Sequence, residues 1–278
     1  MKNTKYKIQN AKYLYFDTHA HLGMEDYDED REELILKLQS EKIGVINIGV
    51  DKKSSFEAVA LANQYENVFA TIGYHPKDAV GEFKEEDFEE LVKNSKVVGI
   101  GECGLDYFRI KGDFKIESLK TNLPAGRQVE LFKKQIDFAV KHDLPVIIHC
   151  RDAHKEIIEI LELKKQEFGD SLRGVIHFFS GGVEEAQKYL DLGFYFSFGG
   201  VITFTDAYDE VIEFIPIERI LPETDAPFVA PVPYRGKRNE PIFVKEVYKK
   251  MAELKNEDLA KIKEILMENI ESLFTKLS

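Results

Sequence analysis

Short apolar runs alternate with longer charged segments from one end of the chain to the other. The runs are nearly continuous and rich in β-branched residues, which is typical of parallel strands that are buried on both faces. They predict eight strands, at Tyr13–Asp17, Val45–Val50, Val68–Gly73, Val97–Glu102, Pro145–His149, Gly174–Phe178, Phe194–Ser197 and Ile220–Glu223.

The segments between these runs carry apolar residues three and four positions apart, the spacing of a helix that packs on one face. Between residues 128 and 142 the apolar positions are Val129, Phe132, Ile136, Ala139 and Val140. This spacing predicts helices at Arg31–Ser40, Ser54–Gln64, Glu85–Lys93, Gln128–His142, His154–Phe168, Glu184–Leu190, Tyr208–Phe214, Pro241–Leu254 and Glu257–Leu277. Alternating strands and helices predict an α/β fold, a TIM (β/α)8 barrel made as a single domain by residues 1–278.

Two parts of the chain fall outside this alternation. Residues 1–11 form an N-terminal extension, and residues 121–127 place a Pro and a Gly where a helix would otherwise begin. We expect the second segment to be a loop insertion. It is either a surface insertion or a mobile loop over the active face, where the long loops of a barrel lie.

The composition limits the classes of function. Thirty-eight basic and fifty acidic residues give a net charge of −12, so any contact with nucleic acid must be local. No apolar run approaches the roughly 18 residues of a membrane span, and two cysteines, Cys103 and Cys150, make a secreted disulfide framework unlikely. We expect a cytoplasmic protein with reduced thiols, without membrane contact or an obligate protein partner.

Metal-binding side chains stand at the ends of five predicted strands. His19 and His21 lie two positions apart and so project to one face, where two imidazoles can chelate a divalent cation. Glu102, His149 and His177 each end an apolar run, as do Glu223 and Asp225. Because a barrel gathers its strand ends around one mouth, these side chains are expected to share a site. Four imidazoles and the carboxylates of Glu102 and Asp225 suffice for two cations, with Glu223 orienting a ligand or a water.

Each of these residues also has a structural interpretation. A lone histidine at a strand end can be a satisfied core residue, and Glu102 can form a salt bridge with Arg109 or Arg151. His75 is left over once the ligands are counted, and is either a phosphate contact or a turn histidine. His142 and His154 lie in helical segments and are not expected in the site. The cysteines each follow a candidate ligand by one residue, so their thiols should point away from it.

The motifs around these residues resemble those of the TatD family of metal-dependent deoxyribonucleases, in the amidohydrolase superfamily. The resemblance covers nearly the whole chain, through the segments 17–22, 73–76, 100–107, 149–153, 177–181, 223–227 and 235–241. It implies metal ligation by His19, His21, Glu102, His149, His177 and Asp225, with Glu102 shared between two metals. The extension at residues 1–11, Phe178 in place of a common cysteine, and the interruption near residues 121–127 depart from the family pattern.

The implied activity is hydrolysis of DNA phosphodiester bonds, as a 3′–5′ exonuclease on single strands. Two divalent ions (Mg, Mn or Zn) would activate a water, and Asp225 would accept its proton. His75, Arg151, Arg235 and Arg238 are expected to contact the substrate. Tyr74, Tyr107 and Phe179 either stack on bases or pack at the barrel mouth. The alternatives are a hydrolase of a small-molecule ester, lactone or amide, and a metal-stabilised scaffold without catalysis.

Overall fold

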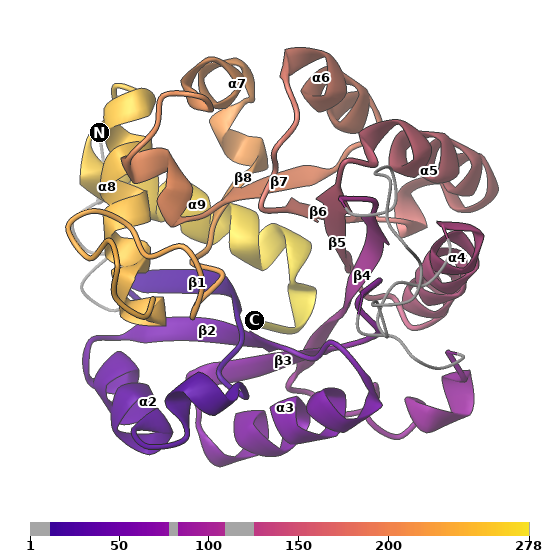
Figure 1. Cartoon of the computed structure of the whole chain (residues 1–278), viewed down its shortest axis with the longest axis horizontal. Helices are drawn as coiled ribbons and strands as arrows, with labels where there is room; N and C mark the ends of the chain where they lie inside the picture. The colour runs from indigo at the N-terminus through magenta and orange to yellow at the C-terminus, as the bar shows by residue number, and fades with distance from the viewer. Residues whose placement is uncertain (1–11, 78–82, 109–124, 278) are drawn as a thin grey trace, which may run out of the picture.

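The computed structural model describes residues 12–77, 83–108 and 125–277. Within them, eight parallel strands follow one another in chain order around a barrel, as predicted (Figure 1). They are β1 (Tyr15–Ala20), β2 (Ile43–Ile48), β3 (Val68–Ile72), β4 (Val97–Asp106), β5 (Val146–Arg151), β6 (Gly174–His177), β7 (Tyr195–Phe198) and β8 (Ile220–Pro222). Backbone bonds from Asp225 to His19 (2.9 Å) and from His21 to Ala226 (2.8 Å) join the last strand region to the first.

Helices surround the strands on the outside (Figure 1). The α-helices are α2 (Arg31–Ser40), α3 (Lys52–Gln64), α4 (Ala125–Lys141), α5 (His154–Phe168), α6 (Val183–Asp191), α7 (Asp209–Phe214), α8 (Val244–Leu254) and α9 (Leu259–Leu273). Short 3-10 turns are η1 (Glu25–Tyr27), η2 (Glu85–Asp87), η4 (Gly169–Ser171), η5 (Gly200–Thr203), η6 (Ile217–Arg219), η7 (Pro241–Phe243) and η8 (Thr275–Leu277). The barrel is therefore a single domain over the part of the chain that the structure describes.

The helix predicted at Glu85–Lys93 is wrong. Only η2 is helical there, closed by the bond from Phe88 N to Glu85 O (2.9 Å), and it is followed by turns with bonds such as Asn94 N to Leu91 O (3.0 Å). Phe88 and Leu91 still reach the core through these turns. The apolar spacing was correct, but tight turns satisfy it as well as a continuous helix does.

The predicted insertion lies only partly within the described residues. Positions 121–124, like the N-terminal extension, fall outside them, and α4 already begins at Ala125. Residues 125–127 are thus helical, and the remainder of the insertion stays a prediction. No helix in the described ranges is long and apolar enough to cross a membrane.

The barrel interior is closed at one end by α9. Ile270, Leu273 and Phe274 pack there against inward residues of the strands, including Phe16 and Ile147. Figure 1 shows α9 and the C-terminus in the middle of the ring. Because alternate residues of a strand share a face, the residue two positions beyond each inward apolar residue also points inward.

This alternation positions the polar site. Ile147 is followed two residues later by His149, Val175 by His177, and Leu221 by Glu223. β5, β6 and the β8 region therefore each contribute an apolar side chain to the plug at one end and a polar side chain to the opposite mouth. The fold therefore places the apolar plug and the polar site at opposite ends of the barrel axis.

The plug predicts a large effect of one substitution. Phe274 is fully buried in it, so Phe274→Ala should leave a cavity and lower the free energy of unfolding by about 3–5 kcal/mol. Phe214→Ala, at a ring that is 40% exposed on α7, is the matched control and should change it by less than about 0.5 kcal/mol. Urea unfolding measures both, and similar midpoints for the two variants would contradict the assigned role of α9.

Candidate metal centre

The mouth opposite the plug holds a cluster of histidines and carboxylates. Ligand atoms lie within 4.8 Å of one another in three groups: His19, Glu102 and His177; His19, His21 and Asp225; and His75, Glu102 and His149. Every ligand candidate named from the sequence is a member. His75, which we expected to contact substrate, lies among them.

Glu102 occupies the centre, and its two oxygens face different histidines. Oε1 lies 2.7 Å from Nδ1 of His149, and 3.6 Å from Nε2 of both His75 and His177. Oε2 lies 3.4 Å from Nε2 of His19 and 3.8 Å from Nε2 of His21. The carboxylate thus stands between two sets of nitrogen donors, the arrangement needed to bridge two cations.

Asp225 lies beside the second set of histidines, which face Oε2 of Glu102. Its Oδ1 lies 3.3 Å from Nε2 of His21, 3.7 Å from that of His19 and 3.9 Å from that of His177. Its side chain is 18% exposed, whereas that of Glu102 is only 4% exposed. Asp225 is therefore the carboxylate of the cluster that solvent or substrate reaches.

His19 provides a test of whether a cation fits. Its ring is 1% exposed, and neither ring nitrogen has a hydrogen-bond partner among the described residues. A buried polar group without a partner is costly, and a cation on Nε2 would supply one. The ring also stacks on that of His177 at 3.4 Å between centroids, which aligns two potential ligands side by side. The donor set fits divalent metal ions.

The charges of the cluster suit cations as well. Burial raises the pKa of Glu102, but His75, His177 and the hydrogen bond from His149 outweigh burial and hold it well below its usual range. For Asp225, burial is likewise outweighed by the hydrogen bond from His21 and by His177, so its pKa is lowered. Both carboxylates are anionic at neutral pH, which is the form that binds metal.

Glu223 orients His177 from behind. Its Oε2 lies 2.9 Å from Nδ1 of His177 and accepts the Ser197 hydroxyl at 2.5 Å, while Oε1 accepts the Phe178 amide at 2.9 Å. Burial lowers the pKa of His177, but Glu223 and Glu102 outweigh it and raise that pKa to about 10. This arrangement matches the orienting role expected for Glu223, because Nε2 is left facing the cluster.

Sequence reasoning missed Asp106. β4 runs four residues further than predicted, so Asp106 shares the inward face of Glu102 and lies 2.9 Å from Nε2 of His149 and 2.7 Å from Nζ of Lys77. Burial raises the pKa of Asp106, but the hydrogen bonds from His149 and Lys77 outweigh burial and hold that pKa below its usual range. The sequence did carry a signal for the inward position of Asp106, because positions 102, 104 and 106 of one strand share a face.

Gly104 makes this extension possible. It pairs with His149 across β4 and β5 at a φ of 142°, and a Cβ there would stand 2.1 Å from the His149 carbonyl oxygen. Only glycine allows so close an approach. The Gly-Glu-Cys-Gly segment therefore sets the distance between Glu102 and His149.

Asp17 was also missed. It is fully buried and accepts the Thr224 hydroxyl at 2.5 Å and the Thr224 amide at 2.9 Å. Burial raises the pKa of Asp17 well above its ordinary value. Asp17 Oδ1 also accepts the His19 amide at 3.2 Å. These bonds hold the segment that carries Asp225 against β1, so Asp17 positions His19 and Asp225 through the backbone.

The basic residues proposed as substrate contacts differ in their surroundings. Arg238 forms a two-bond fork with Asp30 (2.7 and 2.5 Å) and lies 4.5 Å from the Tyr27 ring centroid, so it fastens two loops together. Arg235 donates to the Ala230 carbonyl (2.9 Å) and lies over Phe204, while Arg151 lies over Phe108 at the cavity. Arg151 and Arg235 remain candidates for phosphate contacts, and Arg238 is engaged structurally.

The aromatic residues considered for base stacking are buried. Tyr74, Tyr107 and Phe179 are 8%, 6% and 1% exposed, so the structure favours the packing alternative for all three.

Both cysteines are free and buried as expected, Cys103 in the outer core and Cys150 with its sulfur 3.2 Å from Nδ1 of His154. Arg109, one proposed partner of Glu102, lies outside the described residues.

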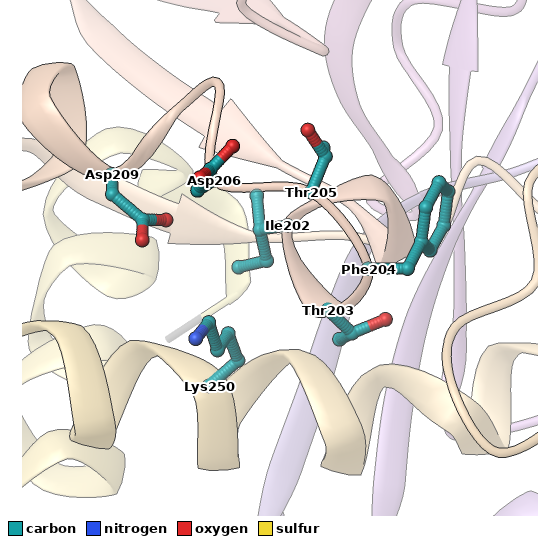
Figure 2. A pocket seen from close by; sticks show the side chains of 7 residues that line it. All are labelled: Ile202, Thr203, Phe204, Thr205, Asp206, Asp209 and Lys250. Atoms are coloured by element: carbon teal, nitrogen blue, oxygen red, sulfur yellow. The ribbon is translucent and has the colours of Figure 1, made fainter.

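The cluster opens into a cavity of about 690 Å³ at the mouth of the barrel. Its lining includes His21, Met24, Arg151, Asp225 and Phe228. A second, more open hollow of about 340 Å³ lies beside η5, lined by Ile202, Thr203, Phe204, Thr205, Asp206, Asp209 and Lys250 (Figure 2). It contains none of the clustered ligands, so the chemistry belongs to the first cavity.

Known proteins share both the sequence and the fold. Residues 16–275 match the family model described as TatD related DNase. The chain is 41% identical over 267 residues to the uncharacterized metal-dependent hydrolase YabD of Bacillus subtilis, covering 94% of this chain and 99% of YabD. It is 32% identical to the uncharacterized metal-dependent hydrolase YcfH of Escherichia coli K12, covering 93% and 94%. The solved structure of YjjV, a TatD homologue from Escherichia coli, superposes with a TM-score of 0.80 at 28% identity, covering 95% and 99%.

The high pKa of His177 predicts how pH affects the metal-free chain. A histidine with a pKa near 6.5 when unfolded and about 10 when folded stabilises the folded chain below pH 6.5, and this stabilisation is lost as pH rises through 10. In EDTA, the urea midpoint should therefore fall across this window. Glu223→Gln should flatten the fall, because it removes a carboxylate that holds the proton.

The control for this experiment is Glu184→Gln, a change of the same type on the exposed side of α6. It should keep the wild-type slope of stability against pH. Identical slopes for Glu223→Gln and the wild type would show that Glu223 does not hold the His177 proton.

Proposed function

The chain belongs to the TatD-related DNase family of metal-dependent hydrolases, and we propose that it hydrolyses DNA phosphodiester bonds at a centre of two divalent metal ions. The ligands would be His19, His21, Glu102, His149, His177 and Asp225, with Glu102 shared. The observation that carries this proposal is the division of the Glu102 oxygens between two histidine sets.

Divalent ions bound there would lower the pKa of a coordinated water and stabilise charge on a phosphoryl oxygen. Side chains of the protein would supply the proton acceptor and the orientation of the ligands. Asp225 lines the cavity, is anionic because its pKa is lowered, and is the more exposed of the two carboxylates. It is therefore placed to accept the proton of the attacking water, while Glu223 keeps His177 aligned.

His75 supports either of two roles. It lies 3.6 Å from Oε1 of Glu102 and lines the cavity, so it can contact a substrate phosphate, as we expected from the sequence. Its place in a group with Glu102 and His149 also makes it a candidate ligand. The number of ions held by a His75→Ala variant separates the two roles.

DNA is favoured over other esters by the guanidinium groups near the mouth. Arg151 lines the cavity of a protein whose net charge is −12, and Arg235 donates to the carbonyl of Ala230, next to Val229 of the cavity lining. A guanidinium pairs with a phosphate through two hydrogen bonds. A cavity closed by the plug at its base suits the end of a single strand, which supports exonuclease action.

A small-molecule ester, lactone or amide is the second candidate. The cavity volume of about 690 Å³ lies within the range of small-ligand sites. Turnover of lactones or p-nitrophenyl esters by metal-loaded protein that cleaves no DNA would favour it.

The shared position of Glu102 predicts the metal content. Wild-type protein should hold about two divalent ions per chain, and Glu102→Gln should hold fewer, because a neutral amide cannot bridge two cations as a carboxylate does. His142→Gln, at a histidine just after α4 and outside the cluster, should keep the wild-type content. Elemental analysis of dialysed protein measures both, and full content in Glu102→Gln would contradict the bridge.

Catalysis predicts a further set of outcomes. Metal-loaded protein should shorten a labelled single-stranded oligonucleotide, EDTA should stop the reaction, and His149→Ala should lose metal and activity together. Asp225→Asn should lower kcat by about 10²–10⁴, as expected for loss of a general base. Asp170→Asn, at a fully exposed aspartate of η4, is the matched control and should be unchanged. Absence of metal-dependent cleavage with Mg, Mn and Zn would refute the nuclease.

A further inference from the structure

Large apolar side chains remain exposed around the cavity mouth. Met24, Phe228 and Phe108 are 38%, 45% and 47% exposed, and they follow β1, β8 and β4. Scattered exposed apolar residues are ordinary on a protein surface. Here, however, Met24 and Phe228 line the same cavity as the clustered ligands.

The backbone of Phe228 is anchored although its side chain is exposed. Its amide donates to the Asp225 carbonyl at 2.9 Å, and its carbonyl accepts the side-chain amide of Asn239, which is fully buried, at 2.6 Å. The ring lies 6.0 Å from the ring of His21, between centroids. An exposed aromatic ring is thus carried on an anchored backbone beside a candidate metal ligand, so the backbone need not be ordered when something stacks on the ring.

Cations accompany the exposed rings. The Arg235 guanidinium lies 4.0 Å from the Phe204 ring centroid, and that of Arg151 lies 3.6 Å from that of Phe108. Figure 2 shows Phe204 at one end of its hollow, with Lys250 and Asp209 at the other. The Phe204 and Phe228 segments are packed together, because the Val232 amide donates to the Thr203 hydroxyl at 2.9 Å.

These pairs belong to different parts of the ring of strands, since Phe108 and Arg151 lie at the ends of β4 and β5, whereas Phe204 and Arg235 follow β7 and β8. Alternating aromatic faces and cations match a single-stranded nucleic acid, whose bases stack and whose phosphates pair with guanidinium groups. A small aromatic ester offers one ring to one platform and would use only one side of the mouth.

We propose that Phe228 is the stacking platform for the base next to the scissile phosphate, with Arg235 of the same segment between β8 and η7 receiving the adjoining backbone. This inference rests on the proposed nuclease function and names how it holds its substrate. Phe228 is a substrate-contacting residue, and any base serves, because every base presents a π face.

The sequence contains no tryptophan, so Phe228→Trp introduces a single fluorescent reporter at this position. Metal-loaded Phe228→Trp protein is titrated with a phosphorothioate single strand, and with an abasic strand of the same length and charge. We expect saturable quenching by the strand with bases and none by the abasic strand. Phe214→Trp, at a ring 40% exposed on α7, is the matched control and should respond to neither.

Kinetics provide the second measurement. Phe228→Ala should lower kcat/KM for the strand with bases by about 5–150-fold, the range of one stacking contact. The preference for that strand over the abasic one should collapse towards unity. Phe228→Leu should behave like Phe228→Ala, because it keeps apolar area but has no π face. Recovery of the preference by leucine would overturn stacking.

The outcomes separate this inference from the nuclease proposal. If wild-type protein cleaves both strands equally well and Phe228→Trp is not quenched, Phe228 is no stacking platform and the nuclease stands. If metal-loaded wild-type protein cleaves neither strand, the nuclease falls, and the stacking inference falls with it.

Discussion

A carboxylate as deeply buried as that of Glu102 costs free energy unless cations or hydrogen-bond donors surround it. The barrel meets this requirement with imidazoles from several separate strand ends, each aimed at one of the two oxygens. The donors repel one another when protonated and need further anions, which Asp225, Glu223 and Asp106 supply. The cluster is therefore a balanced set of charges in which removal of one member leaves its neighbours uncompensated.

On β5, β6 and β8 that balance depends on regular alternation. β1 is irregular between Asp17 and Ala20, so His19 reaches the cluster although Phe16, three positions earlier, packs in the plug. With a period of two, one inward apolar residue packs on α9 and the next inward residue reaches the cluster, as in Ile147 and His149. A slip of one residue would place a ligand among the outer helices. On these strands the apolar plug and the polar mouth follow from the same alternation of side chains. Where β4 and β5 meet, Gly104 allows the two backbones to approach closely.

The sequence predicted the eight strands, most helices and the clustered residues, because each signal is local: an apolar run and the polar residue that ends it. It missed features that depend on distant partners. Arg238 reads as a phosphate contact until Asp30, 208 positions away, is seen to hold it. Asp17 needs Thr224, and the inward position of Asp106 depends on how far β4 continues beside β5. Exposure likewise separates Tyr74 and Phe179, which are buried, from Phe228.

The seam between β1 and the segment after β8 runs through the cluster, since the backbone of Asp225 bonds to that of His19. This has a consequence for protein synthesis. A nascent chain that has released β1 to β6 already carries both histidine sets, but it has no seam and lacks Asp225. The ligand set therefore becomes complete only after the ribosome has delivered Asp225, about four fifths of the way along the 278 residues. Hydrolysis therefore requires the closed barrel, and a chain truncated before Asp225 should have no activity.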